Sequence, residues 1–142
     1  MIVYLVRHAT AGHRASWEGG DDDRLRPLDD RGRRQAEGLV ELLGRREFER
    51  IVSSPAIRCV DTVVPLADSR GLTVEPSEAL AEGAGREAAL ELFRAAAAPL
   101  VASVHGDMVD ELTGGSAKKG STTVLEVDED RVEVLERLPR QA

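Results

Sequence analysis

Two uninterrupted apolar runs, residues 2–6 and 100–104, constrain the fold of this chain more than any other feature. Short runs of this kind are typical of strands that are buried on both faces, as parallel sheets require. The first run ends at Arg7-His8 and the second at His105. Ligands of open α/β sheets bind just beyond the carboxyl ends of the strands, so these side chains are candidates for one crevice. Either ending alone is compatible with an ordinary polar residue that leaves a strand, but the recurrence favours an anion pocket that contains a nucleophile.

Helical and strand patterns alternate along the rest of the chain. Apolar residues recur at helical spacing from about residues 31, 56 and 86 onward, and short strand-like stretches cover residues 48–52 and 71–75. Residues 122–127 and 131–137 are expected to form a hairpin at the sheet edge, joined through Asp128-Glu129-Asp130. The chain is therefore predicted to be an α/β protein: a three-layer α/β/α sandwich with a mostly parallel central sheet and an antiparallel C-terminal hairpin or edge strand.

The helix that starts near Ala56 is the least regular of the three. Ile57, Val60, Val64 and Ala67 are expected to share its buried face, with Arg58 elsewhere. Pro65 would remove a backbone hydrogen bond and is expected to kink or split the helix. Arg58 lies in the first turn, where its guanidinium and the free backbone N–H groups could both face an anion, although a surface salt bridge is the simpler interpretation.

Length, charge and cysteine content limit the function classes. A chain of 142 residues fits a single domain, residues 1–142. The net charge of -7 disfavours nucleic acid and anionic membranes as partners. Cys59 is the only cysteine, so the chain has no intramolecular disulfide and no zinc knuckle. The N-terminal apolar run is too short for a signal peptide or a membrane span, and we expect a cytoplasmic protein.

The polar stretch from residue 11 to residue 30 is expected to be a long loop. It contains the acidic run Asp21-Asp22-Asp23. Contiguous carboxylates on an extended loop point in different directions, so a solvated charge run is favoured over a metal site. Asp29 or Asp30 can cap the helix that follows.

Three short motifs resemble those of the histidine phosphatase superfamily, the branch that includes phosphoglycerate mutases and SixA-type phosphohistidine phosphatases. They are Val6-Arg7-His8-Ala9, Ser53-Ser54-Pro55 with Arg58 and Thr62, and Val104-His105-Gly106. The segment Arg26-Pro27-Leu28 resembles a segment that is typical of the compact SixA-like members. The stretch from His8 through Arg58-Cys59 to residues 80–83 also resembles the phosphatase domain fused to Nudix hydrolases in some actinobacterial proteins.

The resemblance implies roles for individual residues. His8 matches the nucleophile that takes the phosphoryl group, while Arg7, Arg58 and His105 match the residues that bind its oxygens. Gly106, which follows His105 in its motif, is counted with the substrate-binding residues. Glu82 matches the usual position of the general acid, and Glu78 is a competing candidate.

These roles make chemical demands. Guanidinium groups bind phosphate oxygens with two parallel hydrogen bonds, and they can supply the charge stabilisation of phosphoryl transfer, so no metal or other cofactor is expected. One nitrogen of His8 must be unprotonated, with the other donating to a fixed acceptor, for which we expect a backbone carbonyl near Gly12. His105 is more useful when protonated, because it can then donate a hydrogen bond to the phosphoryl group that is transferred. The pKa of Glu82 is expected to be raised by partial burial and by the phosphate.

The sequence leaves the substrate open. The short segment between Arg58 and His105 predicts an open pocket, which suits a phosphomonoester, a nucleotide or polyphosphate end, or a phosphohistidine on a protein. A catalytically weak phosphate-binding or partner-binding module is the alternative. A phosphoglycerate mutase is less favoured because the insertions that cover the pocket in mutases are missing.

Overall fold

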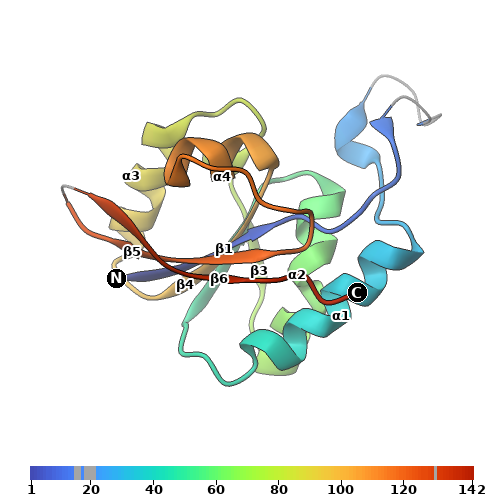
Figure 1. The fold of residues 1–142 in the computed structure, drawn as a ribbon, viewed down its shortest axis with the longest axis horizontal. Helices are drawn as coiled ribbons and strands as arrows, with labels where there is room; N and C mark the ends of the chain where they lie inside the picture. Colours follow the sequence, from blue (N-terminus) through green and yellow to red (C-terminus); the bar gives the residue numbers. More distant parts are fainter. Residues whose placement is uncertain (15–16, 18–21, 130) are drawn as a thin grey trace.

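The computed structural model describes residues 1–14, 17, 22–129 and 131–142. Its centre is a six-stranded sheet in the order β3-β2-β4-β1-β5-β6 (Figure 1). Strands β3, β2, β4 and β1 pair in parallel, and β5 and β6 continue the sheet in the antiparallel sense. The strands are β1 Ile2–Arg7, β2 Arg50–Ser53, β3 Val74–Pro76, β4 Leu100–Val104, β5 Thr122–Val127 and β6 Val132–Leu138. The predicted mostly parallel sheet with a C-terminal hairpin is confirmed. Two residues named in the predictions, Asp21 of the acidic run and Asp130 of the hairpin turn, lie outside the described residues.

Two pairs of helices cover the two faces of this sheet (Figure 1). Alternate side chains of β1 point to opposite sides because the side-chain period of a strand is two residues. Val3 and Leu5 belong to a core cluster with helices α3 and α4, whereas Tyr4 and Val6 pack in a cluster with α1 and α2. The helices are α1 Asp30–Leu43, α2 Ile57–Arg70, α3 Arg86–Ala96 and α4 Gly106–Thr113, with short 3-10 turns η2 Asp23–Leu25 and η3 Glu78–Leu80. The predicted three-layer sandwich is confirmed.

Strand register brings the two predicted histidines to one edge of the sheet. Arg7 is paired with Val104 in the β1–β4 ladder, and the backbone N–H of His8 donates to the Val104 carbonyl at 2.9 Å. On the other side of β4, the N–H of Ser54 donates to the carbonyl of Ser103 at 2.9 Å. The carboxyl ends of β1, β2 and β4 therefore meet where the sequence predicted a crevice.

Helix α1 begins where the sequence allowed, with Asp29 as its N-cap. The Asp29 carboxylate accepts hydrogen bonds from the N–H of Gly32 at 2.7 Å, the hydroxyl of Thr10 at 2.6 Å and the N–H of Gly12 at 3.0 Å. One carboxylate thus starts the helix and also holds the chain that follows His8. A Cβ on Gly32 would lie 2.0 Å from the Thr10 carbonyl, so this close approach requires glycine.

Helix α2 differs from the prediction in two ways. It runs unbroken through Pro65 from Ile57 to Arg70, so the expected split is wrong. Its buried face is also rotated: Arg58, Cys59, Thr62, Val63, Leu66 and Ala67 are buried, whereas Ile57, Val60 and Val64 are only half-buried. The helix turns Arg58 inward because its first turn abuts the polar edge of the sheet and not the apolar core.

Helix α4, which starts directly after His105, was not predicted. Its eight residues offer too short a pattern for periodicity to identify. Met108, Val109 and Leu112 bury its inner face against the core cluster that contains Val3 and Leu5. No helix in the described part of the chain has the length and apolar character needed to cross a membrane.

Candidate active site

A cavity of about 510 Å³ opens at the carboxyl edge of β1 and β4. Its wall contains all six residues that the sequence predicted for the site when Glu82 is taken as the general acid. They are Arg7, His8, Arg58, Glu82, His105 and Gly106. The competing acid Glu78 is absent from this wall and pairs instead with Arg24, with 3.0 Å between Oε1 and the guanidinium. The geometry therefore favours Glu82 over Glu78.

His8 is buried, and its ring orientation is fixed by one hydrogen bond. Nδ1 donates to the Ala9 carbonyl at 2.8 Å, which leaves Nε2 without a proton in the neutral ring. The acceptor is thus not near Gly12, as expected, but on the next residue, whose N–H is held by the Thr62 hydroxyl at 2.9 Å. Burial lowers the pKa of His8 to about 3, and the charges of Arg58, His105 and Arg7 act in the same direction. His8 is therefore neutral at physiological pH.

Arg7 is positioned by its close packing against helix α4. Its guanidinium donates to the Ala117 carbonyl at 2.6 Å, while its buried Nε has no hydrogen-bond acceptor among the described residues. A Cβ on Gly106 would lie 2.8 Å from Cζ of Arg7, so the guanidinium occupies space that only a glycine leaves free. The start of α4 lies in the same wall, and the helix dipole there favours negative charge.

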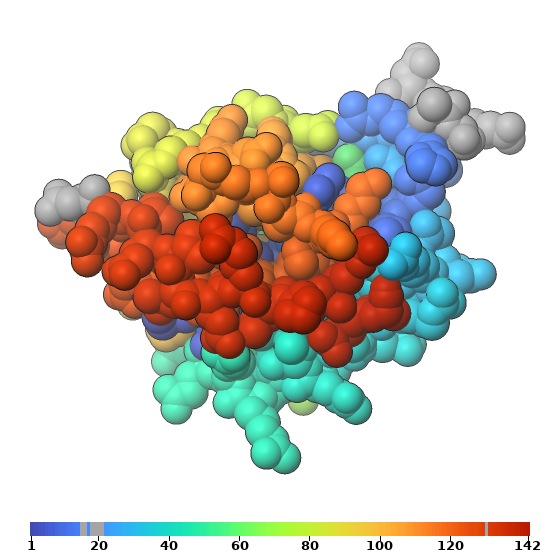
Figure 2. Space-filling view, viewed as in Figure 1, coloured from blue at the N-terminus to red at the C-terminus, as the bar shows by residue number. Residues whose placement is uncertain are grey.

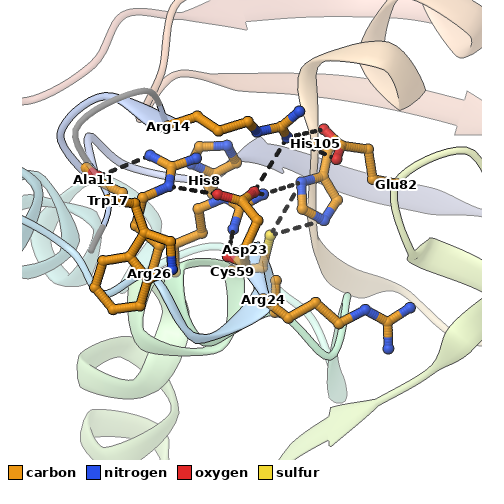
Figure 3. Close-up of polar contacts among 12 residues, drawn as sticks. His8, Ala11, Arg14, Trp17, Asp23, Arg24, Arg26, Cys59, Glu82 and His105 are labelled. Carbon is orange, nitrogen blue, oxygen red and sulfur yellow. Dashed lines mark hydrogen bonds and ion pairs between the residues drawn. The ribbon is translucent and has the colours of Figure 1, made fainter. Parts of the chain in front are cut away.

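Arg58 is buried and shares the carboxylate of Asp23 with two further arginines, Arg14 and Arg26. Figure 3 shows Asp23 between these two arginines. Asp23 Oδ2 lies 3.0 Å from Arg58 and 3.1 Å from Arg14, and Oδ1 accepts from Nε of Arg26 at 2.9 Å. Burial alone would raise the pKa of Asp23, but the hydrogen bond with Arg26 and the charges of Arg58, Arg26 and Arg14 together lower it. Asp23 is therefore not part of a solvated charge run. Nε of Arg58, like that of Arg7, lacks an acceptor in the described structure.

His105 is neutral in this arrangement, contrary to the expectation that it is protonated. Its Nε2 lies 2.8 Å from the Ser54 hydroxyl, and its Nδ1 faces Arg58, which can only donate, at 3.5 Å. These partners assign the proton to Nε2. Burial lowers the pKa of His105 and the Arg58 charge adds to this, while the carboxylates of Glu82, Asp107 and Asp23 oppose it.

Glu82 also departs from the prediction, because it is not buried. Its side chain is 51% exposed and pairs with Arg14, whose Nη2 lies 2.8 and 3.1 Å from the two carboxylate oxygens. Asp107 holds the loop that carries it: the N–H of Gly83 donates to Asp107 Oδ2 at 2.8 Å. The first turn of α4 thereby fixes the backbone beside Glu82.

Cys59 lies beneath His105, with Sγ 3.6 Å from Nε2 (Figure 3). Burial raises the pKa of this thiol to about 12, and the charge of Arg58 only partly opposes the shift. The side chain is therefore an uncharged packing group at physiological pH and not a nucleophile.

Sequence reasoning missed several charged residues of the cavity wall. Arg14, Arg26, Asp107 and Lys119 all line it, and Asp23 anchors three of its arginines. Only Arg26, within the Arg26-Pro27-Leu28 segment, and Asp107, next to the His105 motif, carried a signal that could have identified them. Among the described residues no group of three or more His, Cys, Asp or Glu side chains could hold a metal ion.

The site as a whole is built for an oxyanion. An unprotonated imidazole nitrogen lies in a cavity with two guanidinium groups, each of which has a buried Nε–H donor without an acceptor among the described residues. Leaving a buried donor unsatisfied is costly, and phosphate oxygens are the acceptors that guanidinium groups bind best. An α/β sandwich with such a pocket at its carboxyl edge is suited to binding a phosphate group beside a free imidazole nitrogen.

Comparison with known proteins gives the family. Residues 3–100 match the model of the histidine phosphatase superfamily, branch 1, and the chain belongs to this superfamily. The 8-oxo-(d)GTP phosphatase of Mycolicibacterium smegmatis is 33% identical over 148 residues, covering 89% of this chain and 44% of the relative. The chain thus spans less than half the length of that relative.

Solved structures share the fold. The protein histidine phosphatase SixA in complex with tungstate superposes with a TM-score of 0.81 at 21% identity, over 98% of this chain and 97% of SixA. SixA from Agrobacterium tumefaciens gives a TM-score of 0.75 at 24% identity, over 96% and 97% of the two chains. The resemblance inferred from the motifs is confirmed at the level of superfamily and fold.

Proposed function

We propose that the chain is a metal-independent phosphatase that acts through a phosphohistidine formed on His8. The observation that carries this proposal is the hydrogen bond from His8 Nδ1 to the Ala9 carbonyl, which leaves Nε2 free in a cavity shared with Arg7 and Arg58. A low pKa keeps the ring neutral and so ready to attack phosphorus at neutral pH.

In the first step Nε2 of His8 attacks phosphorus and the leaving oxygen departs. The unused Nε–H groups of Arg7 and Arg58 supply donors for the equatorial oxygens, whose charge must be stabilised in the transition state. His105 is neutral in the free protein, but a bound dianion raises the pKa of a neighbouring imidazole. It then serves as a further cationic donor once substrate is bound.

In the second step water attacks the phosphohistidine and releases phosphate. Glu82 lines the cavity and is paired with Arg14 as a carboxylate, the form that accepts the proton of the attacking water. The arginines take the role that magnesium has in many phosphoryl-transfer enzymes. We therefore expect activity without a metal ion, and a chelator such as EDTA tests this expectation.

The substrate class rests partly on the relatives. One of them is named for action on an oxidised nucleotide and another for action on protein histidine. A nucleotide or polyphosphate end, a phosphomonoester and a protein phosphohistidine are accordingly the candidate substrates. We retain the cytoplasmic location inferred from the sequence.

The test is hydrolysis of p-nitrophenyl phosphate with and without EDTA and vanadate. We expect activity that survives EDTA, is inhibited by vanadate, disappears in His8→Ala and falls by about 10³-fold in Arg7→Ala, as removal of a transition-state donor does. An acid-labile phosphoryl label on wild type that is absent from His8→Ala would identify the intermediate.

The alternatives give different results in the same assays. A binding module would bind phosphate ligands without turnover and would take no label at His8. A mutase would require a bisphosphate primer and would move label between positions of one substrate. Activity that is lost with EDTA and restored by a divalent metal would contradict the proposed mechanism.

A further inference from the structure

Lys119 is held next to the candidate nucleophile by backbone hydrogen bonds. The N–H of Gly120 donates to the carbonyls of both Arg7 and His8 at 3.0 Å, and the N–H of Arg7 donates to the Ser121 carbonyl at 3.0 Å. The loop after α4 is thereby fastened to the end of β1. In the space-filling view this orange segment lies against the blue N-terminal chain (Figure 2). Lys119 lines the cavity as a consequence.

The charge of Lys119 is not compensated as those of its neighbours are. Asp23 pairs with Arg14, Arg26 and Arg58, but in the described structure Lys119 forms no ion pair with any carboxylate. Burial lowers the pKa of Lys119, as do the charges of Arg7 and Arg26, which Asp29 only partly offsets. A partly buried ammonium group among arginines is unfavourable in the empty cavity and becomes favourable when an anion enters.

Glu82 gives a second, independent indication. It is half exposed and ion-paired with Arg14, whereas a general acid must carry a proton when the leaving group departs. An alcohol leaving group needs that proton because an alkoxide is strongly basic. A phosphate leaving group does not, because a phosphomonoester has a second pKa of about 6.

We infer that Lys119 binds a second phosphate group and that the substrate carries a terminal diphosphate. The inference rests on the proposed function and narrows its substrate class. Nε2 of His8 forms a bond to the terminal phosphorus, and the bond from that phosphorus to the bridging oxygen breaks. The bridging oxygen keeps the electron pair and leaves as part of the remaining phosphate group, whose charge Lys119 neutralises. Glu82 then takes a proton from the water that releases the terminal phosphate.

The first test measures binding and needs no turnover. Isothermal titration with inorganic pyrophosphate and with orthophosphate is performed on wild type, Lys119→Met and Lys119→Arg. Lys118→Met is the matched control, because the exposed Lys118 lies outside the wall of this cavity. We expect Lys119→Met to weaken pyrophosphate binding about tenfold or more and orthophosphate binding less than threefold, with recovery in Lys119→Arg. Equal losses for both ligands, or no loss, would overturn the inference.

The second test measures turnover of a nucleoside diphosphate and of the matching monophosphate. We expect wild type to prefer the diphosphate and Lys119→Met to lose most of that preference. Glu82→Gln is expected to give a burst of about one product per enzyme with the diphosphate, because only the second step needs its carboxylate. Equal use of both substrates, with equal losses in Lys119→Met, would refute the inference and leave the phosphatase proposal intact. If neither substrate is hydrolysed but pyrophosphate binding depends on Lys119, the phosphatase proposal fails and the second anion site stands.

Discussion

The imidazole rings of His8 and His105 meet edge to face, with their centroids 5.6 Å apart and their planes at 68°. They come from distant parts of the chain and are brought together because β1 and β4 are neighbours in parallel register. At this separation, protonation of either ring opposes protonation of the other. The pair thus favours a neutral His8, the proposed nucleophile, until an anion enters the cavity.

The depressed pKa of His8 makes the stability of the protein depend on pH. The ring has a pKa of about 3 in the folded protein, against 6.5 for an unperturbed histidine. Between these values the unfolded chain binds a proton that the folded protein does not, so stability falls as the pH drops through this window. In His8→Asn we expect the free energy of unfolding to fall less between pH 7 and pH 5, by about 2 kcal/mol, than in wild type. Urea denaturation at the two pH values measures this difference, and parallel slopes for the two proteins would contradict the assignment.

Gly106→Ala is expected to impair activity through Arg7. The added Cβ would lie 2.8 Å from the guanidinium carbon and would push the side chain away from its present position. Misplacement of a phosphate-binding group by about 1 Å can cost about 10²-fold in rate, so we expect a loss of this order in kcat/KM. The control is Gly115→Ala, since a Cβ at Gly115 meets nothing within 4 Å. Equal kcat/KM values in the two variants would show that the close approach of Arg7 to Gly106 does not affect activity.

Asp107→Ala is expected to slow the second chemical step more than the first. Loss of the hydrogen bond from Gly83 frees the loop that carries Glu82, and loss of the contact between Oδ1 and the N–H of Met108 weakens the start of α4. We expect a decrease of about 1 kcal/mol in the free energy of unfolding and accumulation of phosphohistidine during turnover. Thermal unfolding and rapid-quench labelling measure these effects, with Glu111→Ala as an exposed control on the same helix. Unchanged label accumulation would refute the positioning role.

Cys59 is expected to resist alkylation in the folded protein. Its thiol is buried and its pKa is about 12, so almost no reactive thiolate exists at pH 8. Mass spectrometry after treatment with iodoacetamide should find modification only when urea is present. Rapid modification of native protein would argue that the site beneath His105 opens to solvent.

The local pattern of the sequence was sufficient for most of the fold. The two apolar runs became adjacent parallel strands, and Asp29 caps α1 as one of the two predicted candidates. Helix α2 shows the limit of periodicity, because its face was assigned by hydrophobicity alone and the structure instead buries Arg58 beside the polar end of the sheet. An ionic environment supplied by Asp23 makes that burial possible.

The sequence by itself determined the alternation of strands and helices, the placement of His8 and His105 at strand ends, and the motifs that mark the superfamily. Only the tertiary structure decided that the Ala9 carbonyl orients the ring of His8, that Glu82 is exposed and that His105 is neutral. It also decided that Lys119 lines the cavity and that Asp23 pairs with three of its arginines. The physical reason is that periodicity records which side chains leave water, whereas protonation and ion pairing depend on charges and burial contributed by segments far apart in the chain.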